Sequence, residues 1–333
     1  MPDRATVRQS LFTVITITAM TGGCVEKAPP PAPAVVEEPP TPPPSYTLEP
    51  DQKSIGTDAV YTTQPDETLL DVARRYDLGY TQLITANRGI DPWLPGVGHK
   101  IEVPTFYLLP DVPRKGIVIN LVQQRLYYFP AGSSVVETYP IGVGVQGRAT
   151  PLGTTKVLQK IAHPVWRPPP SIRKEEPDLP AVVPAGPDNP LGDYAFILGW
   201  PGYLIHGTNK PDGVGRNVSH GCIHLYPEDM ERLYKEVPIG TPVRVIEEEI
   251  AGAWLDGQFY VAAYPTKEQA DQLDVNQPVT PSVPKDLKKR VTKFAGHDVD
   301  RIDWTAVDAV VQNRSGLPVV ASTPELAASP PAP

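Results

Sequence analysis

Residues 203–224 read YLIHGTNKPDGVGRNVSHGCIH, and this stretch decides how the rest of the chain is interpreted. It places three histidines and the thiol of Cys222 within the nineteen residues 206–224. A thiol needs a neighbouring base or positive charge to ionise near neutral pH, and an imidazole supplies both. His206 ends one predicted strand and Cys222 begins another, so we expect adjacent strand ends to bring the two side chains together.

Gly221 has a predicted use directly before Cys222. Glycine permits a tight turn, and such a turn lets successive backbone N–H groups converge on a carbonyl oxygen as an oxyanion hole requires. Acyl transfer through a thioester is the reaction class that suits a thiol, an imidazole and this turn.

Residue types alone leave two other interpretations open. His220, Cys222 and His224 alternate along the chain, so an extended segment would present them on one face, and His206 could complete a tetrahedral zinc site. Buried structural packing of the same side chains is the third interpretation.

The sequence around this stretch predicts a β-rich domain. β-Branched and apolar runs favour strands at 117–121, 125–129, 135–143, 194–198, 203–206 and 243–246. Pro227 opens a helix whose apolar face holds Met230, Leu233, Tyr234 and Val237. Residues 164–190 form a proline-rich excursion of the length typical of lids or binding loops.

The motif His206-Gly207-Thr208 followed by Ser219-His220-Gly221-Cys222 resembles the signature of the YkuD-type L,D-transpeptidase family. The resemblance runs from about residue 116 to residue 246. Supporting words are Gly116-Ile117-Val118-Ile119-Asn120, Pro140-Ile141-Gly142, Thr150-Pro151-Leu152-Gly153, Asn189-Pro190-Leu191-Gly192 and Gly240-Thr241-Pro242-Val243.

The resemblance implies a catalytic domain at 112–247 that uses no metal or other cofactor. Cys222 would attack the carbonyl of the third residue of a peptidoglycan tetrapeptide stem, release the terminal D-Ala, and pass the acyl group to an amine. His206 would take the thiol proton and later serve the leaving and attacking amines. Carbapenems are expected to acylate Cys222.

The resemblance also assigns supporting residues. His220 would shape the pocket, and Ser219 and Gly221 would support the turn. His224 stands where many members of the family carry Arg or Asn, which predicts either an altered pH response or specificity, or a simple hydrogen-bonded substitute. Candidate substrate contacts, each with a structural role as its alternative, are Gly207, Thr208, Tyr194, Arg216, Asn217 and Trp166.

Residues 58–105 show a strand, helix, helix, strand pattern, with Thr68 and Asp71 at capping-box positions. The segment is similar to a LysM module through Glu67-Thr68-Leu69, Ala73-Arg74-Arg75-Tyr76, 83–87, Leu94-Pro95-Gly96 and 101–104. LysM modules bind N-acetylglucosamine-containing glycans, so the resemblance implies targeting to the cell wall. A packing module that has lost its ligand is the alternative.

The N-terminal segment reads as an export signal at 1–23, ending in Thr21-Gly22-Gly23-Cys24 like a lipobox with Thr21 in place of the usual Leu. Lipidation of Cys24 is the first expectation, with a plain cleaved signal or an uncleaved anchor as alternatives. Residues 24–57 hold many of the 43 prolines and are predicted to form an extended linker. A net charge of -8 gives no basic footprint for nucleic acid.

After the catalytic domain, residues 248–318 predict a C-terminal subdomain with a hairpin at Asp256-Gly257 and a helix at 304–312. Residues 319–333 are predicted to be a disordered tail. The expected fold class is α+β, mainly β: a β-rich YkuD-type domain, a small βααβ LysM-like module and a C-terminal α/β extension.

The whole arrangement, including the segment 313–318, resembles the Gram-negative periplasmic enzymes that attach an outer-membrane lipoprotein to peptidoglycan. The expected partners are peptidoglycan and a lipoprotein whose C-terminal lysine amine is the acceptor, and the expected location is the periplasm, on the outer membrane through a lipid anchor only. The alternatives are 3-3 cross-linking to another stem, hydrolysis by water, and a non-catalytic wall-binding lipoprotein.

Overall fold

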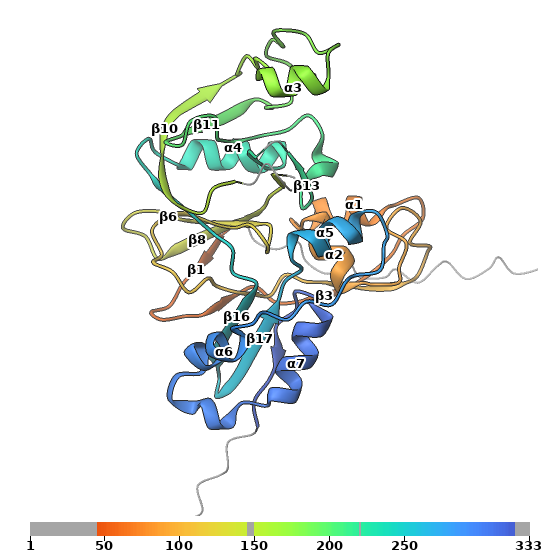
Figure 1. The fold of residues 1–333 in the computed structure, drawn as a ribbon, viewed down its shortest axis with the longest axis vertical. Coiled ribbons are helices and arrows are strands. Elements are labelled where there is room, and N and C mark those ends of the chain that lie inside the picture. The colour runs from red at the N-terminus through yellow and green to blue at the C-terminus, as the bar shows by residue number, and fades with distance from the viewer. Residues whose placement is uncertain (1–44, 145–149, 220, 324–333) are drawn as a thin grey trace, which may run out of the picture. The chain divides into compact units, whose positions relative to one another are not determined.

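The computed structural model describes residues 45–144, 150–219 and 221–323 (Figure 1). These residues all fall within one compact unit. The predicted signal at 1–23, Cys24, His220 and the end of the tail lie outside the described residues. In the ranges that are described, no helix is both long and apolar enough to cross a membrane.

A nine-stranded sheet is the largest element of the fold. All neighbouring strands are antiparallel except two pairs, β6 with β15 and β12 with β14, which are parallel. All five residues of β6 are buried, because this central strand is covered on both faces. In spatial order the strands are β1 (Ser45–Thr47), β8 (Val135–Pro140), β7 (Arg125–Phe129), β6 (Gly116–Asn120), β15 (Pro242–Ile246), β10 (Gly153–Ala162), β11 (Tyr194–Leu198), β12 (Leu204–His206) and β14 (Ile223–His224).

Helix α4 (Pro227–Glu236) covers the core at the β11 to β14 end of this sheet. It begins with proline at its first position, where the missing N–H costs no hydrogen bond. Met230 and Leu233 are fully buried, and Tyr234 packs partly buried against the same core, so the predicted apolar face of this helix is confirmed. The predicted excursion at 164–190 contains the short helix α3 (Pro170–Glu175).

The N-terminal module consists of β3 (Ala59–Thr62), α1 (Leu69–Arg75), α2 (Tyr80–Ala86) and β4 (Lys100–Val103). Its strands pair in antiparallel fashion, and the Thr68 side chain and Asp71 complete the predicted capping box at the start of α1. The expected order of strand, helix, helix and strand is therefore found. Assignment of this fold to the LysM class stays a prediction.

The linker predicted at 24–57 is too long at its C-terminal end. β1 pairs with β8, and β2 (Ser54–Ile55) pairs with β5 (Tyr107–Leu108), so the chain is folded from Ser45 onward. Ile55 is buried and Tyr46 packs against the module core. These few apolar residues follow a long proline-rich run, and the average composition of the segment concealed them.

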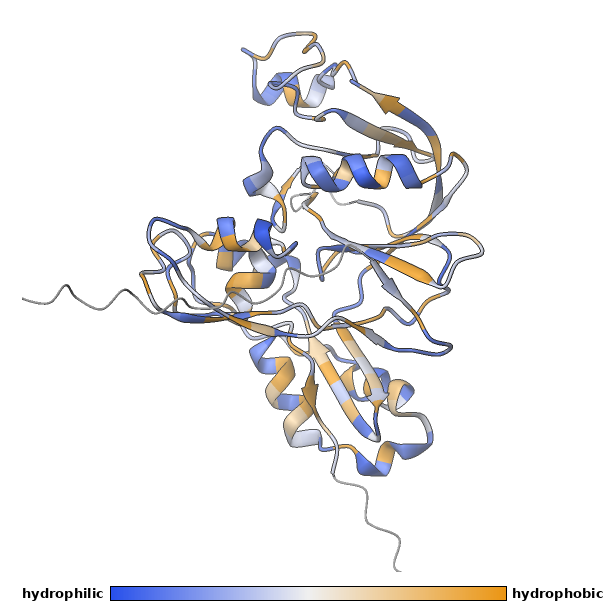
Figure 2. Cartoon of the chain, turned by 180° about the vertical axis from the view of Figure 1, so that it is seen from behind, coloured by the Kyte–Doolittle hydropathy of each residue, from blue (hydrophilic) through white to orange (hydrophobic). Residues whose placement is uncertain are grey.

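The C-terminal subdomain is built on the hairpin of β16 (Ile250–Leu255) and β17 (Gln258–Ala263). Asp256 and Gly257 at its turn have φ of 48° and 77°, the two positive values that a tight two-residue hairpin loop needs. α6 (Leu287–Ala295) packs on β16 and α7 (Trp304–Asn313) packs on β17, and Figure 2 shows the apolar colouring along both strands. Two further elements, α5 (Lys267–Asp274) and the 3₁₀ segment η2 (Gly296–Arg301), complete this part.

Arg314 fixes the end of α7. Its guanidinium is almost fully buried and donates hydrogen bonds to the carbonyls of Tyr264, at 2.6 Å, and Ser282, and to the carboxylate of Glu249. The chain then continues into β18 (Val319–Val320), which pairs with β17.

The predicted tail at 319–333 is therefore wrong at its beginning. β18 forms a ladder with β17, and Ala321 after it is fully buried. The tail was predicted from its overall Pro, Ala and Ser composition, although it begins with two valines. Those two valines form the strand that pairs with the edge of the hairpin. Residues 324–333 lie outside the described residues.

Candidate functional site

Cys222 and His206 lie on one face of the parallel strand pair β12 and β14. Ile205 is paired with Ile223, and His206 with His224. Ile205 and Ile223 are fully buried in the core that α4 covers. Because side chains alternate between the two faces of a strand, His206, His224 and Cys222 point to the opposite face. The structure therefore brings the predicted nucleophile and base to one surface.

The His206 imidazole is held in one tautomer. Its Nδ1 lies 2.5 Å from the carbonyl oxygen of Gly207, and a carbonyl can only accept, so Nδ1 carries the hydrogen. Nε2 is then the basic nitrogen. Burial, together with the adjacent His224, lowers the pKa of His206 to about 3. The ring is consequently neutral near pH 7 and able to accept a proton.

The Cys222 side chain is half-buried, and it is a free thiol. Its Sγ lies 3.9 Å from the carbonyl oxygen of Gly202. Burial raises the pKa of the thiol above its ordinary value of 9.0. In this state Cys222 is a neutral thiol and His206 a neutral imidazole, and not the ion pair that a strongly acidic thiol would form.

His224 forms the wall behind His206. The two rings stack with their centroids 6.1 Å apart and their planes 26° from parallel. A Cβ on Gly142 would meet Cε1 of His224 at 2.0 Å, and a Cβ on Gly213 would meet Nε2 at 3.1 Å. The ring is thus enclosed between two glycines, and burial lowers its pKa to about 4.

Side chains fix the turn that leads into Cys222. Gly221 has φ of 102°, which L side chains rarely adopt, as the predicted tight turn requires. Thr150 donates a hydrogen bond of 2.9 Å to the Gly221 carbonyl, and Ser219 donates one of 2.5 Å to the Cys222 carbonyl. Both carbonyls of the turn are therefore fixed by side-chain hydrogen bonds.

The predicted substrate contacts Arg216 and Asn217 both bond to acidic side chains of helix α5. Asn217 in β13 (Asn217–Ser219) donates a hydrogen bond of 2.8 Å to Asp271 of α5, and Arg216 forms an ion pair with Asp274 of the same helix. These contacts give both side chains a structural role. Their role as substrate contacts stays a prediction, and the motif itself gave no sign of the contact with α5.

Tyr194 and Trp166 also have structural partners. Tyr194 precedes Ala195, the residue paired with His206, so its side chain lies on the face opposite the His206 ring. There its ring contacts that of Tyr234, with the centroids 4.5 Å apart and the planes tilted by 33°. Trp166 forms an isolated bridge with Val183 inside the excursion.

Gly207 and Thr208 stay close to the base, since they follow it directly. The Gly207 N–H donates to the Tyr194 carbonyl, and buried Thr208 accepts from the N–H of Lys210.

Sequence reasoning missed Gly142, Thr150 and Gly213 as parts of the site. Gly142 and Thr150 do occur in two of the words that carried the family resemblance, so a signal was present although their roles were not. Gly213, in the 3₁₀ segment η1 (Pro211–Gly213), had no such signal. As for a zinc site, the described residues contain no group of three or more His, Cys, Asp or Glu side chains that could hold a metal ion, and His220 is not among them.

Comparisons with known proteins show which family the chain resembles. Residues 114–245 match the family model YkuD, the L,D-transpeptidase catalytic domain. The chain is 40% identical over 289 residues to "Probable L,D-transpeptidase YbiS" of Escherichia coli K12, an alignment that covers 83% of this chain and 91% of that protein. It is 40% identical over 269 residues to "Probable L,D-transpeptidase ErfK/SrfK" of Salmonella typhimurium, covering 77% and 82%.

A third relative, "Probable L,D-transpeptidase YcfS" of Escherichia coli K12, is 37% identical over 281 residues, with 80% of this chain and 84% of that protein covered. The similarity thus extends well beyond the catalytic segment, over the N-terminal module and into the C-terminal subdomain. The chain belongs to the L,D-transpeptidase family.

Proposed function

We propose that this L,D-transpeptidase works through a thioester on Cys222. Nε2 of His206 takes the thiol proton as Sγ attacks the carbonyl of the third residue of a peptidoglycan tetrapeptide stem. The C–N bond to the terminal D-Ala breaks, and the imidazolium returns the proton to the leaving amine. An incoming amine then attacks the thioester and gives a proton to Nε2. The C–S bond breaks, and Nε2 passes this proton to Sγ, which restores the free thiol.

The single observation that carries this proposal is the fixed tautomer of His206 on the face that Cys222 shares. Because Gly207 holds the Nδ1 hydrogen, the lone pair of Nε2 is free for the thiol proton without any rearrangement of the ring. The glycine turn before Cys222 leaves room for backbone N–H groups to receive the developing oxyanion.

A carbapenem tests the thioester directly. We expect the full chain to gain the mass of one carbapenem molecule, and Cys222→Ala to gain none. Exchange of D-amino acids onto stems by Cys222→Ala, or acylation at another residue, would contradict the role of this sulfur.

For the acceptor, we propose the lysine amine of an outer-membrane lipoprotein, supported by similarity to the complete arrangement of modules. Mass spectrometry of muropeptides, after incubation of the protein with sacculi and with or without an acceptor lipoprotein, separates three outcomes. Stems that carry lysine peptides support this acceptor, 3-3 cross-linked stems indicate a diaminopimelate amine, and tripeptides alone indicate water.

We further propose that the N-terminal module binds glycan. Trp93 is half exposed and Leu94 is largely exposed, next to the start of α1, and an exposed indole offers the stacking surface that sugars use. Retention of the full chain by purified sacculi should fall in Trp93→Ala. Equal retention of both proteins would contradict a binding role for this side chain.

The proposed location is the periplasm, with Cys24 as the lipidated residue. Cells that express the protein and its Cys24→Ala variant can be labelled with radioactive fatty acid. Label in the first protein and not in the second supports the lipid anchor, and label in neither contradicts it.

A further inference from the structure

We propose that the N-terminal module is a positioning element for catalysis, because residues 74–81 of the module hold the loop 211–216 against His224, the neighbour of His206. We call residues 74–81 the docking segment. The inference rests on the proposed role of His206 and adds a task for the module that is separate from glycan binding.

The start of α2 is capped by the catalytic domain and not by the module itself. Gly79 at the N-cap position offers no side chain, so the first helical N–H groups need partners elsewhere. Tyr80 donates its N–H to the Val214 carbonyl at 3.1 Å, and Thr81 donates to the Gly215 carbonyl at 3.0 Å. The helix is thus completed by the loop that it touches.

Two glycines make this joint possible. A Cβ on Gly79 would lie 2.7 Å from the Cα of Gly215, and a Cβ on Gly215 would lie 2.1 Å from the nitrogen of Tyr80. Distances below 3.0 Å to backbone atoms require the backbones to separate. The two segments therefore meet backbone to backbone, with no side chain between them to absorb a displacement.

The rest of the docking segment is anchored to helix α4, including its N-cap residue Tyr226, and to strand β7. Arg74 donates two hydrogen bonds, of 2.8 and 2.9 Å, to the carboxylate of Glu228 in α4. Tyr226 donates its hydroxyl hydrogen to the Leu78 carbonyl at 3.0 Å, and buried Arg125 of β7 donates to the Asp77 carbonyl at 2.6 Å. These bonds leave the module little freedom to move without taking the loop with it.

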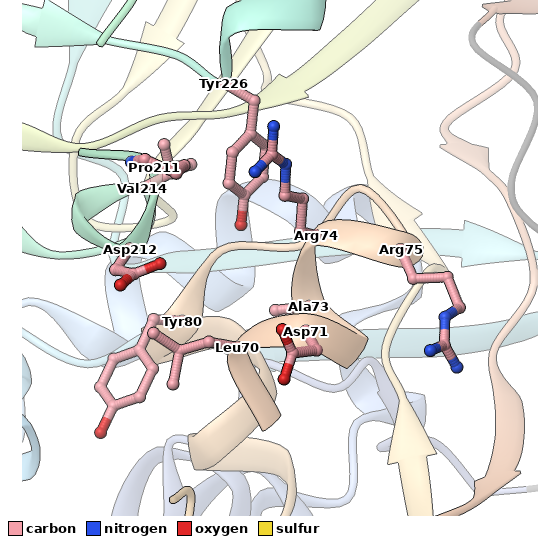
Figure 3. A pocket seen from close by; sticks show the side chains of 10 residues that line it. All are labelled: Leu70, Asp71, Ala73, Arg74, Arg75, Tyr80, Pro211, Asp212, Val214 and Tyr226. Carbon is pink, nitrogen blue, oxygen red and sulfur yellow. The ribbon is translucent and has the colours of Figure 1, made fainter. Parts of the chain in front are cut away.

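A cavity of about 320 Å³ remains where the module faces the loop, as Figure 3 shows. Tyr226 and Arg74 lie together on one side of it, while Asp212 of the loop points toward Tyr80 and Leu70. The two arginines that line the cavity already form ion pairs, Arg74 with Glu228 and Arg75 with Glu67. We therefore interpret the cavity as space left open at the edge of the contact between the module and the loop 211–216, and not as a ligand site.

The loop 211–216 connects the docking segment to the two histidines. Gly213 lies against the His224 ring, whose other side is closed by Gly142, and the ring stacks on His206. The step from the docking segment to the base thus involves one short loop and one ring. If the joint opens, the wall behind His206 loses its support before any substrate contact is lost.

Gly79→Ala in the full chain is the sharpest test, since φ at Gly79 is -84° and alanine fits this backbone apart from the contact with Gly215. We expect the rate of acylation by a carbapenem to fall by about 10- to 100-fold, as for other small displacements of catalytic groups. Retention on sacculi should be unchanged. Histidine ring signals in NMR spectra should show the pKa values of His206 and His224 moving up toward 6.5.

A matched control removes helix stability without touching the joint. Ala86 ends α2 away from the loop, and Ala86→Gly weakens the helix by an intrinsic effect similar in size to the loss of a good N-cap. We expect this variant to keep acylation within about twofold of the original protein. Tyr226→Phe, which removes one anchor and little volume, should slow acylation by about two- to fivefold in case Gly79→Ala fails to fold.

The outcomes separate the two proposals. Gly79→Ala or, if that is unfolded, Tyr226→Phe with unchanged acylation and unchanged histidine signals overturns the positioning role. Equal slowing in Ala86→Gly overturns it too, because general loss of stability would then explain the effect. If the original protein is not acylated, the proposed function fails, and the histidine signals alone still decide whether the module holds the ring pair.

Discussion

His206 stays neutral because two effects act on the same ring. Its burial disfavours a charge, and the stacked His224 ring adds a second group that would become positive. Cys222 faces the same burial, which favours the neutral thiol. The free enzyme is therefore expected to be unreactive toward general electrophiles, and reactive only when a bound acyl group receives the sulfur.

Alkylation of Cys222 by iodoacetamide should report this state. In a Cys24→Ala protein we expect the rate to rise with pH and reach its midpoint above 9, because only the thiolate reacts and burial raises its pKa. His206→Ala should leave the midpoint nearly unchanged. A rate that is already level below about pH 6 would show a thiolate–imidazolium pair instead.

His224 makes a separate prediction for stability. Its pKa is about 4 when folded and 6.5 when exposed, so between these values the unfolded chain takes up a proton that the folded protein excludes. Folding stability should therefore fall as pH drops from 6.5 toward 4, by about 1.4 kcal/mol for each pH unit from this group. Above pH 6.5 this pH dependence fades over about one pH unit, as the unfolded imidazole loses its remaining protons.

Urea unfolding of the His224→Asn variant at pH 7 and at pH 5 checks the sign. The variant should lose about 2 kcal/mol less than the original protein between these two pH values, whatever its stability at pH 7. Buried carboxyl groups are common to both proteins and cancel in the comparison. Equal losses would mean that His224 is protonated in the folded protein.

At the scale of elements, α5 acts as a clamp on β13. Asn217 donates to Asp271 and to the Lys267 carbonyl, and its own amide oxygen accepts from Gln124. The strand leads directly into the turn of Cys222 and pairs in parallel with β9 (Val143–Gly144). Helix α5 of the C-terminal subdomain and strand β9 thus hold the segment that leads to Cys222 from two sides.

Asn217→Ala should destabilise the protein by about 1 to 3 kcal/mol, because Asp271 and Gln124 lose their partner in a half-buried place. Urea unfolding measures this effect. Gln277→Ala, an exposed amide just after α5, should change stability by less than about 0.5 kcal/mol. Normal stability of Asn217→Ala together with a raised KM would support the role in substrate binding that the sequence suggested.

At the scale of the whole molecule, the folded chain is longer than its composition indicated. At the N-terminal side, the folded part begins at Ser45, because β1 joins the large sheet and β2 pairs with β5. At the C-terminal side it extends to residue 323, because β18 pairs with the C-terminal hairpin. These short strands are stabilised by partners far away in the sequence. They carry too little local pattern to be recognised without those partners.

Truncation measures what the first of these segments contributes. A chain that begins at residue 45 should melt within about 1 °C of the original protein, since the residues removed belong to the predicted linker. A chain that begins at residue 58 loses the burial of Ile55 and the β1 ladder, and should be less stable by about 2 kcal/mol, or about 5 °C in Tm. If both truncated chains have the same Tm, residues 45–57 contribute no stability and belong to the linker.

The sequence predicted the parts of the molecule that local pattern determines. The motif around Cys222 placed the thiol and His206 on neighbouring strands, although the parallel register sets Cys222 level with Leu204 rather than with His206. The capping box at Thr68 placed the first helix of the module. The sequence did not predict the long-range contacts, which are those of Gly142 with His224, of α5 with Asn217, and of the loop carbonyls with α2. Each of these depends on two segments that only the tertiary fold brings together.

The parallel pairing of β6 with β15 also sets the order in which the enzyme can mature. Every strand and turn of the reaction centre, from Gly142 to His224, lies in the chain between these two central strands. Closing so long a loop is slow, since its entropy is lost before the contacts of β15 compensate for it. Until that moment Cys222 is an uncovered sulfur on an unfinished polypeptide, open to oxidants and to other thiols. The pairing of β15 with β6 is thus the step that ends this exposure of Cys222.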